Sequence, residues 1–475
     1  MSNRPPAPPY PRPAYAWYVV GVLFIAYTFS FIDRQIISLM VDPIRRDLQI
    51  SDTQISLLQG LAFALFYTFL GIPIARAADV RSRRWIMTVG VFLWSLATAA
   101  CGLARSFAAL FIARMGVGVG EAALNPSAYS LIADYFPPKT VSRAISVYAG
   151  GIFVGAGLAY ILGGTVIELA SATVDIQLPV IGAAHPWQIA FFAVGLPGLA
   201  ISALLLTIRD PLRRGVAHIG HADESTTAAN TDDDSGPPRA IPLRQAVGFV
   251  WARRRTFGTH IGGFTFLSIL GYANINWVPA YLMRTFGLGI GETGRIFGVV
   301  LLIFGTGGVV GAGWIADALR RRGHTDANMR CVMIGAIVLV PVGIAAPLVS
   351  SLPVAIGLLC VSTFLWSLPM GIAPAALQPI TPNQLRAQVS ALYQFIMNLM
   401  GLAVGPTMVA VITDYVFASD GAVRYSLAIT TLLMAPPAAL VLGLGLKHYR
   451  ASMNATENWM PVAAPGAEPG ANDEP

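Results

Sequence analysis

The sequence predicts an all-α integral membrane protein with twelve transmembrane helices in two six-helix bundles. Composition gives the first indication: of 475 residues, 55% are hydrophobic and only 12% are charged, and the mean hydropathy is +0.63. Soluble globular domains are about 25% charged, so an ordinary soluble enzyme is excluded. The second indication is the recurrence of apolar segments of about 20 residues, the length that crosses a bilayer. The third is one long polar gap that divides these segments six and six.

Each candidate span is a long apolar segment bounded by charged or turn-forming residues. We expect the first span to be retained rather than cleaved as a signal peptide, because it contains Asp33 and Arg34 and no small-residue cleavage site follows at the right distance. The spans run near 16–41, 54–76, 84–104, 107–135, 141–169, 187–208, 257–284, 293–318, 329–350, 353–377, 384–413 and 425–447.

Basic residues gather on one side of the predicted membrane. They cluster after spans 2, 4, 6 and 8 and before span 7, whereas the opposite loops hold few. Positively charged loops stay in the cytoplasm, so both termini are predicted to be cytoplasmic. The same pattern assigns the net charge of +7 to membrane loops and not to a nucleic-acid partner. Arginine strongly outnumbers lysine, which hints at a GC-rich bacterial genome and hence at the inner membrane.

The polar segments divide the chain into five parts. We expect a disordered N-terminal tail over 1–15, a first bundle over 16–208, a cytoplasmic linker over 209–243, a second bundle over 244–449 and a disordered C-terminal tail over 450–475. Just after the linker, Leu243, Val247, Val250 and Trp251 share a helical face that ends at three arginines. This pattern fits a short interfacial helix or an extension of span 7.

Two loops, one in each half, repeat one arrangement. After span 2 the chain reads Ala75-Arg-Ala-Ala-Asp79-Val-Arg-Ser-Arg83-Arg84, and after span 8 it reads Gly313-Trp-Ile-Ala-Asp317-Ala-Leu-Arg-Arg-Arg322. Both resemble the loop motif of the major facilitator superfamily, G-x-x-x-D-R-x-G-R-R/K, although the first copy lacks both glycines and the first arginine. In that family the matching aspartate latches the bundles when the cavity faces outward. The resemblance therefore implies the major facilitator fold and gating roles for Asp79, Arg83, Arg84 and Asp317.

A narrower resemblance covers roughly residues 20–210. Its parts are Phe31-Ile-Asp33-Arg34 in span 1, Leu57-Leu-Gln59 at the start of span 2, Arg114-Met-Gly-Val-Gly-Val-Gly-Glu121-Ala in span 4 and Asp134-Tyr-Phe-Pro137 at its end. Together they resemble the spinster-like branch of the superfamily, which includes proton-linked exporters of lysophospholipids and sphingosine phosphate. The resemblance implies a lipid-like substrate.

Four ionisable residues lie well inside the predicted spans: Asp33, Arg34, Arg114 and Glu121. Each costs about 2.5–3.5 kcal/mol to insert, against about 0.3–0.6 kcal/mol gained per large aliphatic residue. We therefore expect them to pair or to face a wet cavity, and two carboxylates with two guanidiniums allow neutral pairing. Such carboxylates could switch protons during transport, since burial favours their neutral form and a nearby arginine favours the ion. The alternative is a permanent ion pair that only orients the helices.

The spacing of these residues predicts two polar stripes. Arg114, Glu121 and Asn125 share one side of span 4, and Tyr27, Ser30 and Arg34 share one side of span 1. In the resembled fold both spans line a central cavity, so the stripes could meet there. We assign proton coupling to Asp33 and Glu121. Substrate binding is assigned to Arg34, Arg114, Tyr27 and Asn125; for Arg114, latching a loop is an equal alternative.

The second half offers weaker candidates. Its spans hold polar or amphipathic residues that could contact substrate or hydrogen-bond between helices: His260, Asn274, Asn276, Trp366, Tyr393, Gln394 and Asn398. Trp366, Tyr393, Gln394 and Asn398 enter the predicted substrate site. We predict no metal site, because no histidine or cysteine has ligand spacing, and no ATP-binding domain, because no Walker loop is present.

These observations predict a proton-coupled secondary active transporter that works by alternating access and exports a lysolipid- or sphingoid-phosphate-like amphiphile. We expect a monomer that needs no cofactor besides protons, with the bilayer and a small amphiphilic or anionic substrate as its partners. The alternatives are an organic-anion or sugar-phosphate importer of the same superfamily, an integral-membrane lipid-modifying enzyme, and a receptor that does not transport. An enzyme would need a catalytic histidine or carboxylate pair near the membrane surface, which we do not find, so we predict no enzymatic activity.

Overall fold

The computed structural model describes residues 10–171, 176–178, 182–211, 243–382 and 385–456. These residues form long helices and one small antiparallel hairpin, in which β1 (Ile176–Leu178) pairs with β2 (Gly182–Ala184). The all-α prediction is confirmed.

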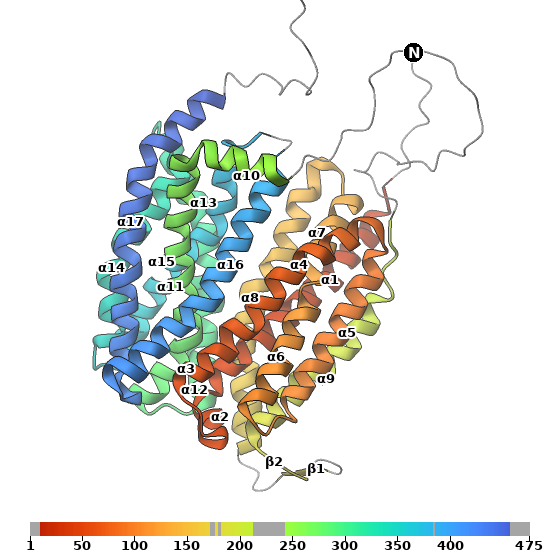
Figure 1. Ribbon diagram of the computed structural model, residues 1–475, viewed down its shortest axis with the longest axis vertical. Coiled ribbons are helices and arrows are strands. Elements are labelled where there is room, and N and C mark those ends of the chain that lie inside the picture. Colours follow the sequence, from red (N-terminus) through yellow and green to blue (C-terminus); the bar gives the residue numbers. More distant parts are fainter. Residues whose placement is uncertain (1–9, 172–175, 179–181, 212–242, 383–384, 457–475) are drawn as a thin grey trace, which may run out of the picture.

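The first half of the chain supplies the red to yellow helices of Figure 1. Three predicted spans are interrupted: a 3-10 turn (Ile37–Leu39) follows the first helix, a π turn (Leu57–Leu61) divides span 2, and a break after Glu121 divides span 4. The helices are α1 (Pro13–Ile36), α2 (Val41–Leu48), α3 (Asp52–Ser56), α4 (Ala62–Val80), α5 (Arg83–Cys101), α6 (Phe107–Glu121), α7 (Leu124–Tyr135), α8 (Pro138–Ser171) and α9 (Pro186–Leu205).

The second half supplies the green to blue helices. Here too a π turn (Leu301–Gly305) divides the second span of the half, and another (Ile412–Phe417) ends the fifth. The helices are α10 (Leu243–Ala252), α11 (Arg254–Phe286), α12 (Ile290–Val300), α13 (Thr306–Arg321), α14 (Ala327–Leu348), α15 (Leu352–Leu377), α16 (Arg386–Val411) and α17 (Val423–Thr456).

Eleven helical segments of the described residues are long and apolar enough to cross a membrane. The twelfth predicted span is α11, which has 33 residues and is therefore long enough at about 1.5 Å per residue. Its polar residues, among them Thr256, His260, Asn274 and Asn276, lower its hydropathy. Thr256, His260 and Asn276 are buried in the protein, and Asn274 donates a hydrogen bond to the carbonyl oxygen of Leu270 in the same helix.

The ends of the chain differ in part from the sequence-based boundaries. Helix α1 begins at Pro13, within the segment expected to be a disordered tail, and residues 1–9 lie outside the described residues. At the other end, α17 continues to Thr456, so a disordered tail from 450 was wrong for its first residues. The helix continues because no proline or glycine interrupts it there. The predicted linker 209–243 falls mostly on residues 212–242, which are also outside the described part.

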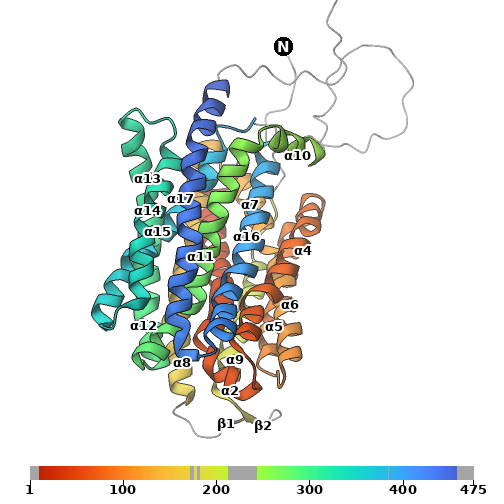
Figure 2. The ribbon, with the colours of Figure 1, turned by 60° about the vertical axis from the view of Figure 1, so that its left-hand side comes forward.

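The segment after the linker is a separate helix. Helix α10 ends at Ala252, and Arg253 leaves the helical conformation with φ −108° and ψ 31° before α11 begins. In Figure 2, α10 lies across the ends of α11 and α16. The segment is therefore a separate short helix and not an extension of span 7, and its place at the membrane interface stays a prediction.

The two halves are two groups of packed helices that contact each other along two seams. Within the halves, α1 packs on α8, and α11 packs on α16 and α17; between them, α8 packs on α12, and α16 packs on the π turn Leu57–Leu61. Glycine permits this closeness. A Cβ on Gly60 would lie 1.9 Å from the carbonyl oxygen of Leu402, and one on Gly294 would lie 2.2 Å from that of Tyr160. Only glycine fits at these two crossings.

Candidate functional site

Four charged side chains are buried together in the first half. Asp33 and Arg34 end α1, Arg114 and Glu121 lie on α6, and all four are between 0% and 5% exposed. They pair crosswise: Arg34 forms an ion pair with Glu121, and Arg114 Nη1 lies 3.4 Å from Asp33 Oδ1. Each helix therefore contributes one charge of each sign, and the cluster is neutral when all four groups are ionised.

A glycine-rich run brings α6 close enough for this pairing. A Cβ on Gly118 would lie 2.6 Å from the carbonyl oxygen of Phe63, and one on Gly120 would lie 2.6 Å from that of Gly90. Helix α6 therefore packs tightly on both α4 and α5. The run that carried the family resemblance thus also serves the packing of α6 on these two helices.

The Arg34–Glu121 pair lies among aromatic rings. Ser30 Oγ donates a hydrogen bond of 2.7 Å to Glu121 Oε2, the oxygen that also accepts from Arg34. The guanidinium carbon of Arg34 lies 4.8, 4.3 and 5.1 Å from the ring centroids of Phe31, Phe63 and Tyr67. Among the described residues, Glu121 Oε1 and Arg34 Nε have no hydrogen-bond partner. The pair therefore keeps one free acceptor and one free donor.

The Asp33–Arg114 pair is held by neutral groups. Thr98 donates a hydrogen bond to Asp33 Oδ2, and Arg114 donates to the carbonyl oxygens of Leu58 and Asp33, both at 3.4 Å. Arg114 Nη2 has no hydrogen-bond partner among the described residues. Arg114 is fully buried between α1 and the π turn of span 2, so it does not lie at a helix end where it could latch a loop.

Asn125 and Tyr27 extend the site through aromatic side chains. Asn125 Nδ2 donates to the Tyr67 hydroxyl at 3.0 Å, and Tyr148 donates to Asn125 Oδ1 at 2.6 Å. The ring of Tyr27 stacks on that of Tyr148 with 4.6 Å between centroids. Since Tyr67 also packs on Arg34, a chain of contacts joins both predicted stripes.

The second-half candidates are spread over several places. Trp366 is buried against Gly271, whose Cβ would lie 3.1 Å from the indole ring. Tyr393 packs at 5.6 Å from His260, a fully buried histidine whose ring nitrogens have no hydrogen-bond partner among the described residues. Gln394 is exposed and donates to Asn398 at 3.1 Å on the same helix. These second-half candidates have separate packing partners, and their place in a substrate site stays a prediction.

The predicted gating residues do not form one group. Arg83 is buried and pairs with Asp134 and with Asp210 (2.9 Å), which ties the start of α5 to the ends of α7 and α9 within the first half. Arg84 lies 5.5 Å from the ring of Trp85. Asp317 pairs with Arg320 on its own helix at 2.9 Å. Asp79 ends α4, and its side chain lies outside the described residues.

Sequence reasoning missed a network of charges between the halves. Arg284 of α11 contacts Asp42 at 2.7 Å and Asp52 at 2.6 Å, while Arg45 reaches Asp420 at 2.9 Å and Asp52 at 3.2 Å. Thr53 donates its backbone N–H (2.6 Å) and hydroxyl (2.7 Å) to Asp414. The available signal in the sequence was two acids ten residues apart, Asp42 and Asp52, together with Arg284 at the end of a predicted span.

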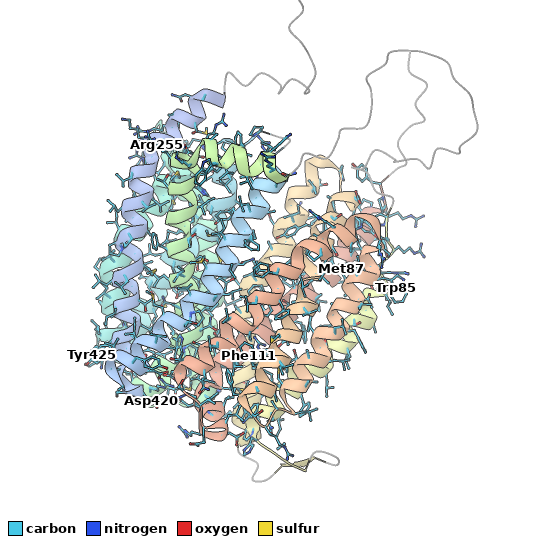
Figure 3. All side chains as sticks on the ribbon, in the orientation of Figure 1. Trp85, Met87, Phe111, Arg255, Asp420 and Tyr425 are labelled. Carbon is cyan, nitrogen blue, oxygen red and sulfur yellow. The ribbon has the colours of Figure 1, made fainter. Side chains whose placement is uncertain are left out.

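This network lies at the end of the molecule that carries the hairpin, where Figure 3 labels Asp420. We call it the hairpin-end network.

Midway along the helices, Ser38 donates to Asn276 at 3.0 Å and Tyr160 donates to the carbonyl oxygen of Ile275. The contacts between the halves named above lie in these two regions, and Figure 3 places Arg255 at the opposite end of the molecule. Arg34 of the first half also interacts with Tyr272 of the second. The hairpin-end network thus holds the halves together at its end of the molecule.

Comparisons with known proteins agree with this architecture. The family model of the Major Facilitator Superfamily matches residues 23–406. An MFS-type efflux pump of Mycolicibacterium smegmatis is 28% identical over 425 residues, covering 89% of this chain and 90% of that protein. Protein spinster of Drosophila melanogaster is 26% identical over 322 residues, which are 66% of this chain and 48% of that protein. A crystal structure of a bacterial homolog of the human lysosomal transporter Spinster, in an inward-facing and unoccupied conformation, has a TM-score of 0.73 and 25% identity, and the match covers 95% of this chain and all of that one.

Proposed function

The chain belongs to the Major Facilitator Superfamily, in its spinster-like branch, and from this premise we propose that it is a proton-coupled exporter of an amphiphile with a phosphate-bearing head. That it is an integral membrane transporter with the twelve-helix fold follows from the family match and the structure. The observation that carries the finer proposal is the buried Arg34–Glu121 pair inside its aromatic surround.

Protons and substrate would compete at this pair. Glu121 holds Arg34 when it is ionised, and a proton on Glu121 would release the guanidinium, whose planar fork suits a phosphate or carboxylate. An ammonium group on the substrate would instead compete with the proton for Glu121. The ammonium group of a zwitterionic head and the proton would therefore occupy Glu121 in turn, and we favour antiport. Asp33 is the second proton carrier, since it is buried and forms an ion pair with Arg114.

The rings around Arg34 support an amphiphilic substrate. Phe31, Phe63 and Tyr67 place apolar ring faces next to the guanidinium of Arg34. The head group of an amphiphile can therefore bind Arg34 while its tail contacts the rings. The alternative within the superfamily is an organic-anion or sugar-phosphate importer, which would use Arg34 and have no need of apolar walls. A lipid-modifying enzyme is the alternative from another class, and the family and fold are typically those of transporters.

In an alternating-access cycle, the hairpin-end network would be the closed gate of the transporter. We propose that the end with the termini faces the cytoplasm of a bacterial inner membrane, as the arginine distribution favours. The hairpin-end network then closes the outer side, and the structure corresponds to an inward-facing state of a monomeric transporter. The similarity to a homolog described as inward-facing supports this assignment.

The test is binding and transport with three probes. Purified protein is titrated with lysophosphatidylethanolamine, lysophosphatidic acid and glucose 6-phosphate, and proteoliposomes are then given a pH gradient. We expect micromolar binding of a lysolipid that is lost in Arg34→Ala and kept in Arg295→Ala, an exposed arginine of the other half. Tight binding of glucose 6-phosphate, or equal lysolipid affinity of the wild type and Arg34→Ala, would overturn the proposal. Accumulation driven by the gradient must also fail in liposomes without protein.

A further inference from the structure

An apolar groove of about 570 Å³ lies on the second half, under α10. It extends along α11 and is bordered by α16. Most of its lining is aliphatic or glycine, and the single charged member is an arginine at the start of α11. The lining residues used below are Val250, Trp251, Arg254, Gly258, Gly262 and Met400.

The glycines of this groove are not explained by helix packing. A Cβ on Gly258 would meet no atom within 4 Å, and one on Gly262 would meet only Val441 at 3.7 Å. Elsewhere in the same half, a Cβ on Gly401 would lie 2.4 Å from the Ser268 hydroxyl, so that glycine is required by its neighbours. The face of α11 that carries Gly258 and Gly262 is open where a side chain would fit. Its volume is that of a small-molecule site, about 300–1,000 Å³.

The rim of the groove is cationic and amphipathic. Arg254 is exposed and makes no ion pair with the described residues, and Arg253 and Arg255 flank it in the sequence. Trp251 is 70% exposed at the end of α10, the kind of position that Trp takes at a membrane–water boundary. Arginine clusters next to a transmembrane helix attract anionic lipid heads, at about 1 kcal/mol per residue. The positive charge of the rim therefore favours an anionic head group, while the apolar interior of the groove favours an alkyl chain.

We propose that this groove binds one anionic membrane phospholipid, with its phosphate at Arg254 and one acyl chain along the face of Gly258 and Gly262. The groove shares no lining residue with the Arg34–Glu121 pair, because its lining belongs wholly to α10, α11 and α16. Met400 lies on α16, the helix that also packs on the π turn of span 2 in the other half. The lipid would thus contact a helix that moves relative to the first half during transport.

Native mass spectrometry on delipidated full-length protein tests this site. The protein is titrated with phosphatidylglycerol and, separately, with phosphatidylcholine of the same chains. We expect the wild type to bind one phosphatidylglycerol preferentially. Arg254→Ala should weaken it about fivefold, the equivalent of about 1 kcal/mol, and remove the preference. Gly258→Leu should weaken both lipids about tenfold by filling the groove.

Two controls match these variants. Arg255→Ala removes an equally exposed neighbouring arginine that does not line the groove, and Gly357→Leu adds the same side chain at another open glycine of this half. Both should bind like the wild type. The proposal is overturned if the wild type shows no bound lipid, if both lipids bind equally, if the controls lose binding as well, or if a lysolipid substrate displaces the phosphatidylglycerol. The assay needs no pH gradient and no transport, so its outcome is independent of the proposed transport activity.

Discussion

Arg284 and Asp52 join the two halves through a two-pronged ion pair, with Nη1 2.6 Å from Oδ2 and Nη2 2.8 Å from Oδ1. Asp52 is fully buried, and Arg284 comes from the second half of the chain, near the end of α11. Parallel double contacts of this kind are among the strong charge-assisted hydrogen bonds. The pair can exist only while this end is closed.

Arg284→Ala should therefore shift the protein toward a state open at the hairpin end. Removing one partner of a buried pair costs about 3–5 kcal/mol, and about 3 kcal/mol changes a population ratio roughly a hundredfold. The measurement is the distance between spin labels at Arg46→Cys and Ser419→Cys, two exposed positions, in a background without the native cysteines. We expect a longer distance in the variant.

The control for this prediction is Arg295→Ala. Arg295 also pairs across the halves, with Glu168, but both side chains are about half exposed, at 52% and 53%. Exposed pairs contribute only about 0–1 kcal/mol, so the label distances should remain those of the parent. Identical distances in all three proteins would show that the hairpin-end network does not hold this end closed.

Glu121→Gln and Asp33→Asn should each abolish pH-driven transport while leaving the protein folded and inserted. Each substitution keeps the shape of the side chain but removes the titrating group, so a change of pH can no longer alter the charge of the pair. Counterflow of a bound lysolipid, which needs no gradient, should survive. Proteoliposome uptake at several pH gradients is the measurement, with Glu168→Gln, a half-exposed carboxylate, as the matched control. Unchanged pH dependence in both variants rules out the proton assignment.

Arg83→Ala should destabilise the protein, whereas Arg84→Ala should not. Arg83 is buried between Asp134 and Asp210, and its loss leaves two acids without their cation, at about 3–5 kcal/mol for a broken buried pair. Thermal unfolding in detergent would show a lower midpoint for Arg83→Ala and a midpoint close to the wild type for Arg84→Ala. Equal midpoints, together with altered cytoplasmic accessibility in Arg83→Ala, would restore the gating role inferred from the sequence.

Asp79→Asn tests the latch that the family motif implies. If Asp79 helps to close the end with the termini, its neutralisation should favour the inward-open population. The readout is labelling of cysteines placed on the α4 and α16 faces of that end, compared with Asp317→Asn, whose carboxylate pairs within its own helix. Labelling rates equal to those of the wild type contradict the latch.

Much of the fold was predictable because a bilayer imposes a length on every apolar segment. The boundaries of α5 and α15 lie close to those expected from hydropathy alone. Charge neutrality also predicted that the four buried ionisable residues pair. Charge neutrality could not predict which arginine pairs with which acid. Asp33 and Arg34 are adjacent, so the pairing depends on how α1 is rotated relative to α6.

The remaining site features depend on relations that no single segment contains. Arg284 is one polar residue at a helix end until α11 is placed beside α3, and only then do Asp42 and Asp52 become its partners. Hydropathy also could not give the neighbours of Trp366 and Tyr393: Trp366 packs against Gly271 and Tyr393 lies beside His260, and their role in substrate binding stays a prediction.

The π turn at Leu57–Leu61 fixes the register of the outer gate. A π turn holds one residue more than an α turn over the same rise, so deleting one residue there would rotate α3 by about 100° relative to α4. Thr53 and Asp52 would then point away from Asp414 and Arg284, and the Leu58 carbonyl that accepts from Arg114 would move with the turn. The second half also has a π turn in its second span, at Leu301–Gly305. A single inserted residue in the first half thus ties the contacts that join the halves to the buried charge cluster.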